Sequence, residues 1–287
     1  MVRIFIVIGV VLAVANILCA RAIFSDSDES SVYFLNIGQG DAELVAHRGI
    51  HMLIDAGRDG KTSIELERVL EDKKYIDVVL LTHADSDHAG GIYQVLDRFS
   101  VGVLLVGNGY HETWEEVLDY AKQKGVAVYK LDMHDRITHK DVTATVLWPD
   151  PLYNAKTDNE KSIVLKYKHT DYAVLFAGDI SERVEDIIVS LFDIDADILK
   201  VPHHGSKYSS SMLFVREVSP LLSVIEVGTN SYGHPTPETL SRLSSVGSHI
   251  LRTDEQGTVR VYTENGSVRV QKIDQGSTSL NVSEVEP

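Results

Sequence analysis

The chain has 287 residues, of which 44% are hydrophobic, and this is enough to bury one sizeable core. Asp and Glu outnumber Lys and Arg by 42 to 27, and the formal net charge of −15 argues against broad, sequence-independent binding of nucleic acid through a basic face. The single cysteine, Cys19, excludes a disulfide framework and a thiolate zinc cage, so His, Asp, Glu or Asn must hold any metal.

The chain begins with an apolar run at residues 4–20, which Arg3 precedes and Arg21 follows. This run indicates a signal peptide or a membrane anchor within residues 1–22. Its length is near the short limit for a bilayer span, and the Ala-Arg-Ala triplet at 20–22 is typical of a cleavage site, so both alternatives stay open. The charges predict that the rest of the chain lies outside the cytoplasm, anchored or secreted, after a polar linker at residues 23–31.

Short β-rich runs separated by Gly-rich turns follow the linker, and they predict antiparallel strands. From Thr62 the apolar periodicity alternates between helix and strand. The first half is therefore predicted to contain strands over 32–37, 42–47, 51–56, 78–83, 101–107, 127–131 and 144–149, and helices over 62–74, 92–99 and 112–124.

After a polar loop at residues 149–161, the second half repeats the order of strands followed by alternating helices and strands. Two such halves predict an α/β fold with two mixed sheets face to face and helices outside, an αββα sandwich over residues 32–272. The Ser-rich tail at residues 273–287 is expected to be disordered. The predicted elements are strands over 162–169, 172–179, 196–205, 221–228, 250–253, 258–263 and 267–272, and helices over 181–192, 211–218 and 237–243.

Four of the predicted strands end in unusually polar segments. Ligands in α/β sheets gather beyond the carboxyl ends of strands, because the loops there are free to carry polar groups. The candidate residues at these ends are Asp55, His83, Asp85, Asp87, His88, Asp179, His203 and His204.

The loop THADSDHAGG at residues 82–91 is the densest of these segments and predicts metal binding. Oxygen and imidazole ligands suit zinc, manganese or iron, and a divalent cation would remove the repulsion among crowded carboxylates. The alternative is a solvated turn with helix-capping aspartates, which is favoured for Asp85 taken alone. For Asp179 alone, a helix cap and a metal ligand are equally balanced.

The order of Asp55, the HADSDH motif, Gly178-Asp179 and HHGS resembles the metallo-β-lactamase fold family. Within that family the chain is similar to the subgroup formed by the soluble domain of the DNA-internalisation competence protein ComEC. The stretches FLNIGQGDAELV, ILKVPHHGSKYSSS, NSYGHPTPETL and LRTDEQGTVRV add to the resemblance, which covers about residues 32–272.

The resemblance implies a centre for one or two divalent metal ions, zinc or manganese. His83 and Asp85 would serve one ion, Asp87 and His88 the other, and Asp179 would bridge them. One or both of His203 and His204 would complete the set. Asp85 stands where the common family pattern has a second histidine, and this exchange makes manganese as suitable as zinc.

The resemblance leaves open whether one metal ion or two are bound. Many family members have a further histidine between the HADSDH motif and the bridging aspartate. The four histidines in that interval or close to it, His111, His134, His139 and His169, lack a suitable setting. Asn159 and Ser162 approximately match an Asn and a Ser that the ComEC-like subgroup has before the next strand, and they are candidate substrate residues.

Metal-assisted hydrolysis follows as the expected chemistry, because a bound cation lowers the pKa of water and offsets charge in the transition state. Asp87 could orient that water. His234 is a candidate for contacting a phosphate or protonating a leaving group, and Ser206 and Lys207 are candidates for holding a phosphate oxygen. The alternatives are a turn histidine at a helix start and two exposed loop residues.

Three functions remain in competition. The first is a phosphodiesterase or nuclease that acts on nucleic acid outside the cytoplasm, in the setting of DNA uptake; only family analogy indicates DNA as its substrate. The second is a hydrolase of a small ester, lactone or β-lactam, which the acidic balance favours. The third is a non-catalytic metal-binding module, which the many carboxylates disfavour, because closed structural zinc sites prefer four tetrahedral ligands. The membrane is a partner only if the N-terminal segment is uncleaved, and the sequence identifies no protein partner.

Overall fold

The computed structural model describes residues 30–107, 112–275 and 279–281. The apolar run at residues 4–20, and with it the choice between signal peptide and anchor, lies outside the described residues. Among the helices of the described ranges, none is long and apolar enough to span a membrane.

The first sheet contains nine strands. Its N-terminal part is an antiparallel meander in which Val32 pairs with Val45 and Val45 with Met52. The following strands add in parallel through helical crossovers. In spatial order the strands are β16 (Ser279–Asn281), β15 (Ser267–Lys272), β14 (Val259–Glu264), β1 (Ser30–Phe34), β2 (Glu43–His47), β3 (Ile50–Ile54), β4 (Tyr75–Leu81), β5 (Ser100–Gly107) and β6 (Ala127–Leu131).

The second sheet has seven strands and the same division into an antiparallel and a parallel part. Strands β7 to β10 run antiparallel to their neighbours, and β10 to β13 run parallel. In spatial order the strands are β13 (His249–Arg252), β12 (Leu222–Ile225), β11 (Ile198–Lys200), β10 (Ala173–Phe176), β9 (Val164–Lys168), β8 (Val142–Trp148) and β7 (Arg136–His139).

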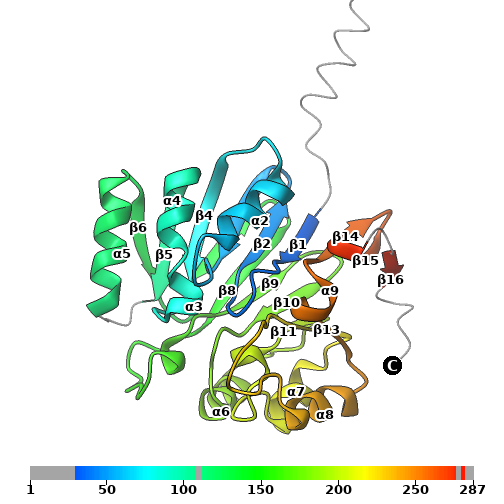
Figure 1. The fold of residues 1–287 in the computed structure, drawn as a ribbon. Coiled ribbons are helices and arrows are strands. Elements are labelled where there is room, and N and C mark those ends of the chain that lie inside the picture. The colour runs from blue at the N-terminus through cyan, green and yellow to red at the C-terminus, as the bar shows by residue number, and fades with distance from the viewer. Residues whose placement is uncertain (1–29, 108–111, 276–278, 282–287) are drawn as a thin grey trace, which may run out of the picture.

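The two sheets pack face to face, and helices cover their outer faces (Figure 1). Alternate residues of both sheets fill the central layer, where the rings of Phe34 and Phe176 lie 6.3 Å apart between centroids. This arrangement confirms the predicted αββα sandwich. The helices over the first sheet are α2 (Lys61–Leu70), α4 (Ile92–Arg98) and α5 (Glu112–Gln123), and those over the second are α6 (Glu182–Leu191), α7 (Met212–Val218) and α8 (Pro237–Ser245).

The structure adds elements that the sequence pattern did not indicate. One face of strand β7 is exposed and the other is only partly buried. Its sequence RITH therefore lacks the alternation of apolar and polar residues that predicts a strand. The helices α3 (Ser86–Ala89) and α9 (Thr253–Gln256) are single turns, too short for a periodicity to emerge.

The expectation of a disordered tail from residue 273 is wrong for its described part. A short turn at Ile273–Gln275 is followed by β16, which pairs antiparallel with β15. Asp274 fastens this segment, because its carboxylate accepts a hydrogen bond from the N–H of Thr258 at 2.9 Å and pairs with Arg68 at 2.7 Å. The edge of β15 also offers unpaired backbone groups that β16 satisfies.

Candidate metal centre

The polar strand ends singled out from the sequence meet at one end of the sandwich. Asp55 follows β3 and the loop 82–91 follows β4, two parallel neighbours in the first sheet. Asp179 follows β10 and the pair His203-His204 follows β11, two parallel neighbours in the second. A cavity of about 330 Å³ opens between these loops. The residues that line it are Gln39, Arg58, Asp85, Ser86, Asp87, Asn159, Asp179, His203, His204, Tyr232 and His234.

The loop after β4 turns its two histidines inward. His83 and His88 are both buried, and their ring centroids lie 4.1 Å apart. Asp85 occupies the N-cap position of α3, as the capping alternative requires, but its side chain makes no capping hydrogen bond. One of its oxygens instead lies 3.7 Å from His83 Nε2.

Asp55 supports this loop through hydrogen bonds to Thr82 and His88. One carboxylate oxygen accepts hydrogen bonds from the hydroxyl of Thr82 at 2.6 Å and from Nδ1 of His88 at 2.7 Å. The other accepts the N–H of Thr82 at 2.7 Å. A carboxylate on Nδ1 leaves Nε2 of His88 as the ligand atom, which is the arrangement that supports metal-binding histidines.

Asp179 lies at the centre of the donor groups. Its Oδ1 is 3.3 Å from His88 Nε2, and its Oδ2 is 3.7 Å from His204 Nε2 and 3.9 Å from His203 Nε2. His204 Nε2 also lies 3.6 Å from a carboxylate oxygen of Asp87. These spacings place Asp179 where it could contact every ion held by its neighbours.

An unusual turn presents the histidine pair. His203 and His204 both have positive φ values, 51° and 52°, which are uncommon for non-glycine residues and occur where surrounding structure enforces them. Gly205 follows at φ 83°, and a Cβ there would lie 2.6 Å from Pro235 Cβ. The tight turn buries His204 and leaves His203 partly exposed at the cavity.

Several buried donor atoms at this centre make no hydrogen bond among the described residues. Nε2 of His83, His88 and His204 and Oδ1 of Asp179 are each buried without a hydrogen bond among the described residues. Leaving such atoms unpaired is costly, whereas imidazole nitrogen and carboxylate oxygen are the ligands of zinc and manganese. The residues therefore fit one or two divalent cations.

The carboxylates and the histidines of this centre neutralise one another's charges. Burial opposes charging of His204, but the carboxylates of Asp179 and Asp41 outweigh it and raise the pKa of His204 to about 10. Burial likewise opposes ionisation of Asp179, yet His88 and His204 hold the pKa of its carboxyl well below the usual range. A cation that binds here would release the histidine protons and take over their role.

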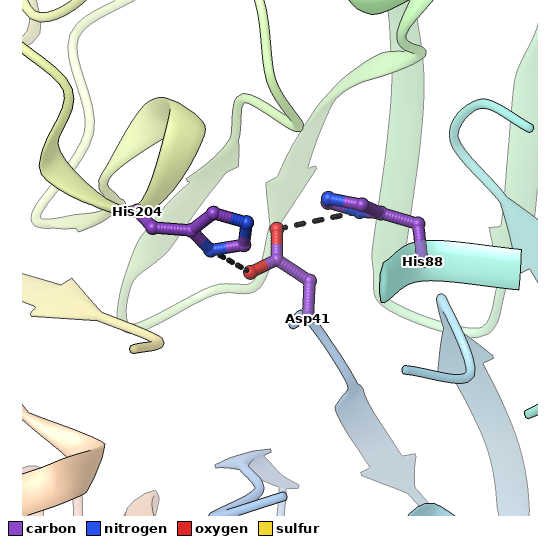
Figure 2. A group of neighbouring side chains, drawn as sticks. All are labelled: Asp41, His88 and His204. Atoms are coloured by element: carbon purple, nitrogen blue, oxygen red, sulfur yellow. Dashed lines mark ion pairs between the residues drawn. The ribbon is translucent and has the colours of Figure 1, made fainter. Parts of the chain in front are cut away.

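Asp41 is a residue of this centre that the sequence interpretation missed. It lies between the two buried histidines (Figure 2), 3.2 Å from His204 Nδ1 and 3.6 Å from His88 Nδ1. Lys200, fully buried on β11, forms an ion pair with it, and Glu226 accepts the N–H of Ala42 beside it at 3.2 Å. A lysine inside the apolar run ILKV was the available signal, because a buried lysine needs an anionic partner.

The candidate substrate residues separate into two groups. Asn159 and His234 line the cavity, and Nδ1 of His234 is buried and accepts or donates no hydrogen bond within the part of the chain that the structure describes. Ser162 is buried and its hydroxyl accepts the N–H of Asp179 at 3.2 Å, so it positions a ligand rather than facing the cavity. Ser206 is also buried, and its hydroxyl accepts the N–H of Tyr208. Lys207 stacks on the ring of Tyr208 outside the cavity lining.

Two cavity residues had no signal in the sequence. Arg58 reaches over from the loop after β3, and its guanidinium lies 3.9 Å from Asp87. Tyr232 is 68% exposed, and its ring lies 5.8 Å from that of His234. A cation and an aromatic face therefore border the cavity beside the acidic donors.

Comparison with known proteins finds relatives of the sequence and of the fold. The model of the metallo-beta-lactamase superfamily matches residues 35–225. ComE operon protein 3 of Bacillus subtilis is 32% identical over an alignment of 262 residues that covers 83% of this chain and 34% of that protein. Competence protein ComA of Neisseria gonorrhoeae is 30% identical over 268 residues, 92% of this chain and 36% of that protein. The chain thus spans about a third of the length of these relatives.

A solved structure shares the fold at low sequence identity. The metallo-beta-lactamase fold protein YhfI from Bacillus subtilis superposes with a TM-score of 0.59 at 12% identity, over 83% of this chain and 100% of that chain. At such low identity the likeness concerns the arrangement of strands and helices and not the substrate.

Proposed function

The chain belongs to the metallo-β-lactamase superfamily of metal-dependent hydrolases, and from this premise we propose that it is a phosphodiesterase that cleaves nucleic acid outside the cytoplasm. The observation that carries the proposal is the set of four buried donor atoms, on His83, His88, Asp179 and His204, that make no hydrogen bond among the described residues. Asp179 and His204 line a cavity that is open to solvent, so a ligand can reach the ions that this set would hold.

The bound cations would supply water of lowered pKa and would offset charge that develops on the scissile phosphate. The residues of the chain have complementary roles. Asp87, at 3.6 Å from His204 Nε2, accepts a hydrogen bond from the attacking water or holds an ion. His234 and Arg58 at the cavity wall donate hydrogen bonds to phosphate oxygens.

Nucleic acid is proposed as the substrate because one relative, ComA of Neisseria gonorrhoeae, is a competence protein by name, and competence concerns the uptake of DNA. The bordering Arg58 and Tyr232 support this choice, since proteins bind single strands by pairing phosphates with cations and stacking bases on aromatic rings. The action outside the cytoplasm rests on the N-terminal apolar run.

The test uses the full chain with added manganese or zinc, against single-stranded DNA, double-stranded DNA, bis-p-nitrophenyl phosphate and nitrocefin. We expect cleavage of DNA and of the model diester, loss of both on addition of chelator, and loss of both in Asp87→Asn. Asp119→Asn, an exposed aspartate on α5, is the matched control and is expected to keep full activity.

Three results would contradict the proposal. Diester cleavage that survives chelator, or that is undiminished in Asp87→Asn, would exclude the proposed mechanism. Nitrocefin turnover without diester cleavage would favour a lactam or small-ester hydrolase. Metal binding without any turnover would favour a metal-binding module.

A further inference from the structure

A second cluster of metal-ligating side chains lies at the opposite end of the sandwich. In β2, Glu43 pairs with Ile54 beside the candidate metal centre, whereas His47 is at the other end of the strand, about 13 Å away at 3.3 Å per residue. His139 ends β7, and His169 follows the far end of β9. The turn between β7 and β8 brings Asp141 to the same end.

The donor atoms of this second cluster are already close together. His47 Nε2 lies 3.0 Å from Asp141 Oδ1, and His169 Nε2 lies 3.9 Å from Asp141 Oδ2. Donor atoms of the three residues all lie within 4.8 Å of one another. Ligands at about 2.0 Å from a tetrahedral zinc ion are about 3.3 Å apart, so a small contraction would close the site.

The hydrogen-bonding capacity of these histidines exceeds what the protein supplies. His47 and His169 are 3% and 7% exposed. Among the described residues, Nδ1 of His47 and Nε2 of His139 are buried without a hydrogen bond. The rings of His139 and His169 lie 6.1 and 5.3 Å from that of His47. Three imidazoles and one carboxylate are thus gathered at this end, and two of the ring nitrogens are buried without a hydrogen bond among the described residues.

We propose that His47, His139, Asp141 and His169 form a second metal site, which binds zinc and has a structural role. Three nitrogens and one oxygen complete a tetrahedral set, which is the preference of structural zinc. An apolar cavity of about 50 Å³, lined in part by Ile50, Val142 and Tyr167, lies against His47 and His139. Little room remains there for a substrate.

The proposed site would link the two sheets. His47 belongs to β2 of the first sheet, whereas His139 ends β7 of the second sheet, Asp141 lies in the turn from β7 to β8, and His169 directly follows β9. Ser30, the first residue of β1, pairs with His47, and its hydroxyl lies 2.9 Å from the hydroxyl of Tyr172, which directly precedes β10 of the second sheet. Zinc would therefore connect the two sheets at the end of the sandwich where β1 begins.

Arg48 is the protein group that a zinc ion would compete with. Its guanidinium lies 3.4 Å from Asp141 Oδ1, and its side chain is 30% exposed, so it can turn toward solvent when Asp141 takes another partner. Arg48→Gln is therefore expected to keep or tighten zinc binding. A cluster that only neutralised charge around Asp141 would bind no zinc in either form.

The experiment measures zinc per chain in the full-length protein after exposure to zinc and removal of the excess. His169→Ala is expected to hold one zinc fewer than the unaltered chain. His249→Ala changes a half-buried histidine at the same end of the second sheet but on its other edge, and it is expected to lose none. Because His169→Ala could impair folding, Asp141→Asn, in a solvent-accessible turn, is measured in parallel with the same expectation.

A second readout distinguishes the two sites. Cobalt replaces zinc, and the intense visible absorption of a tetrahedral cobalt site is expected to decrease in both His169→Ala and Asp141→Asn. It is expected to persist in a chain that carries Asp179→Asn, because that change affects only the candidate metal centre. Equal zinc content in the unaltered chain, His169→Ala and Asp141→Asn would overturn the proposal, as would a cobalt signal that only Asp179→Asn removes.

Discussion

The two ends of the sandwich contain the same residue types in different surroundings. At one end, Asp179 and His204 border an open cavity of about 330 Å³ with polar walls, and the buried His83 and His88 lie close to them. At the other end, His47 and His139 border an apolar cavity of about 50 Å³, and Asp141 and His169 lie close to His47. The two ends therefore differ in whether a substrate can reach the side chains, and not in the types of ligand. An accessible end suits catalysis, and an inaccessible one suits stabilisation.

The topology explains this difference. Parallel strands need long crossover connections, and the loops at their carboxyl ends are free to carry functional groups. The first end receives such loops from β3, β4, β10 and β11. The second end is made partly of hairpin connections, such as the turn between His139 and Val142, which are short and leave no room for a cleft.

The largest expected effect comes from Asp179→Asn, because the Asp179 carboxylate lies 3.3 to 3.9 Å from ring nitrogens of His88, His203 and His204. Loss of this charge should weaken cation binding and lower kcat/KM by about 10³-fold or more, about 4 kcal/mol. The measurement is the hydrolysis of bis-p-nitrophenyl phosphate with saturating manganese. Asp135→Asn, in an exposed turn, is the control. Equal activity of the two variants would show that the first end takes no part in catalysis.

Much of the first end could be predicted from the sequence. Each polar segment followed an apolar run, so the rule for strand ends placed Asp55, the loop 82–91, Asp179 and the histidine pair at one edge of the fold. The resemblance to the metallo-β-lactamase family was confirmed by the family model over residues 35–225. The local pattern and the family pattern agreed because both depend on the same strand ends.

The rest required three-dimensional contacts. Asp41 is distant in sequence from His204 and Lys200, and only the pairing of two sheets shows that they meet. His47 and His169 lie 122 positions apart, one at the end of β2 and the other directly after β9, and neither stands in a motif. Ser162 and Ser206 were expected at the substrate because of their neighbours, but burial turns both hydroxyls toward backbone N–H groups.

A buried carboxylate provides the next prediction, because it fixes the loop after the histidine pair. Glu185 accepts the N–H groups of Ser210 at 2.5 Å and Ser211 at 2.8 Å, and burial raises its pKa to about 7. Above the ordinary pKa of 4.5 the unfolded chain loses this proton first, so stability should fall as pH rises from about 4.5 to 7. The full loss is about 3 kcal/mol.

Urea unfolding at pH 5 and pH 8, with chelator present, measures this contribution. Glu185→Gln carries no titrating group, so the unaltered chain should lose more stability than the variant between the two pH values. The histidines at both ends titrate in both proteins and cancel in the difference. Parallel changes in the two proteins would show that Glu185 is ionised throughout and that this loop imposes no pH dependence.

A smaller effect is expected for Asp55→Asn, which alters the support of His88 without removing a ligand. Asn tolerates the positive φ of 55° at this position, so the change tests the hydrogen bond to Nδ1 and not the backbone. Manganese affinity should fall by about 10- to 100-fold. Asp77→Asn is matched, because Asp77 accepts the N–H of His51 at 2.8 Å near the other end of β4, and its manganese affinity should not change. Equal affinities in the two variants would mean that the carboxylate behind His88 is dispensable.

The smallest effect is expected for Tyr232, which borders the open cavity and could contact a long substrate there. Its ring is 68% exposed beside His234, and base stacking on such a ring contributes about 1 kcal/mol or more. Tyr232→Ala should therefore raise KM for single-stranded DNA about fivefold and leave KM for an abasic strand of the same length unchanged, because that strand has no aromatic rings. Tyr129→Ala, which removes a ring 61% exposed on β6, should change neither value. An equal rise for both substrates would mean that Tyr232 shapes the metal centre, whereas no rise for DNA would place the strand on another face of the cavity.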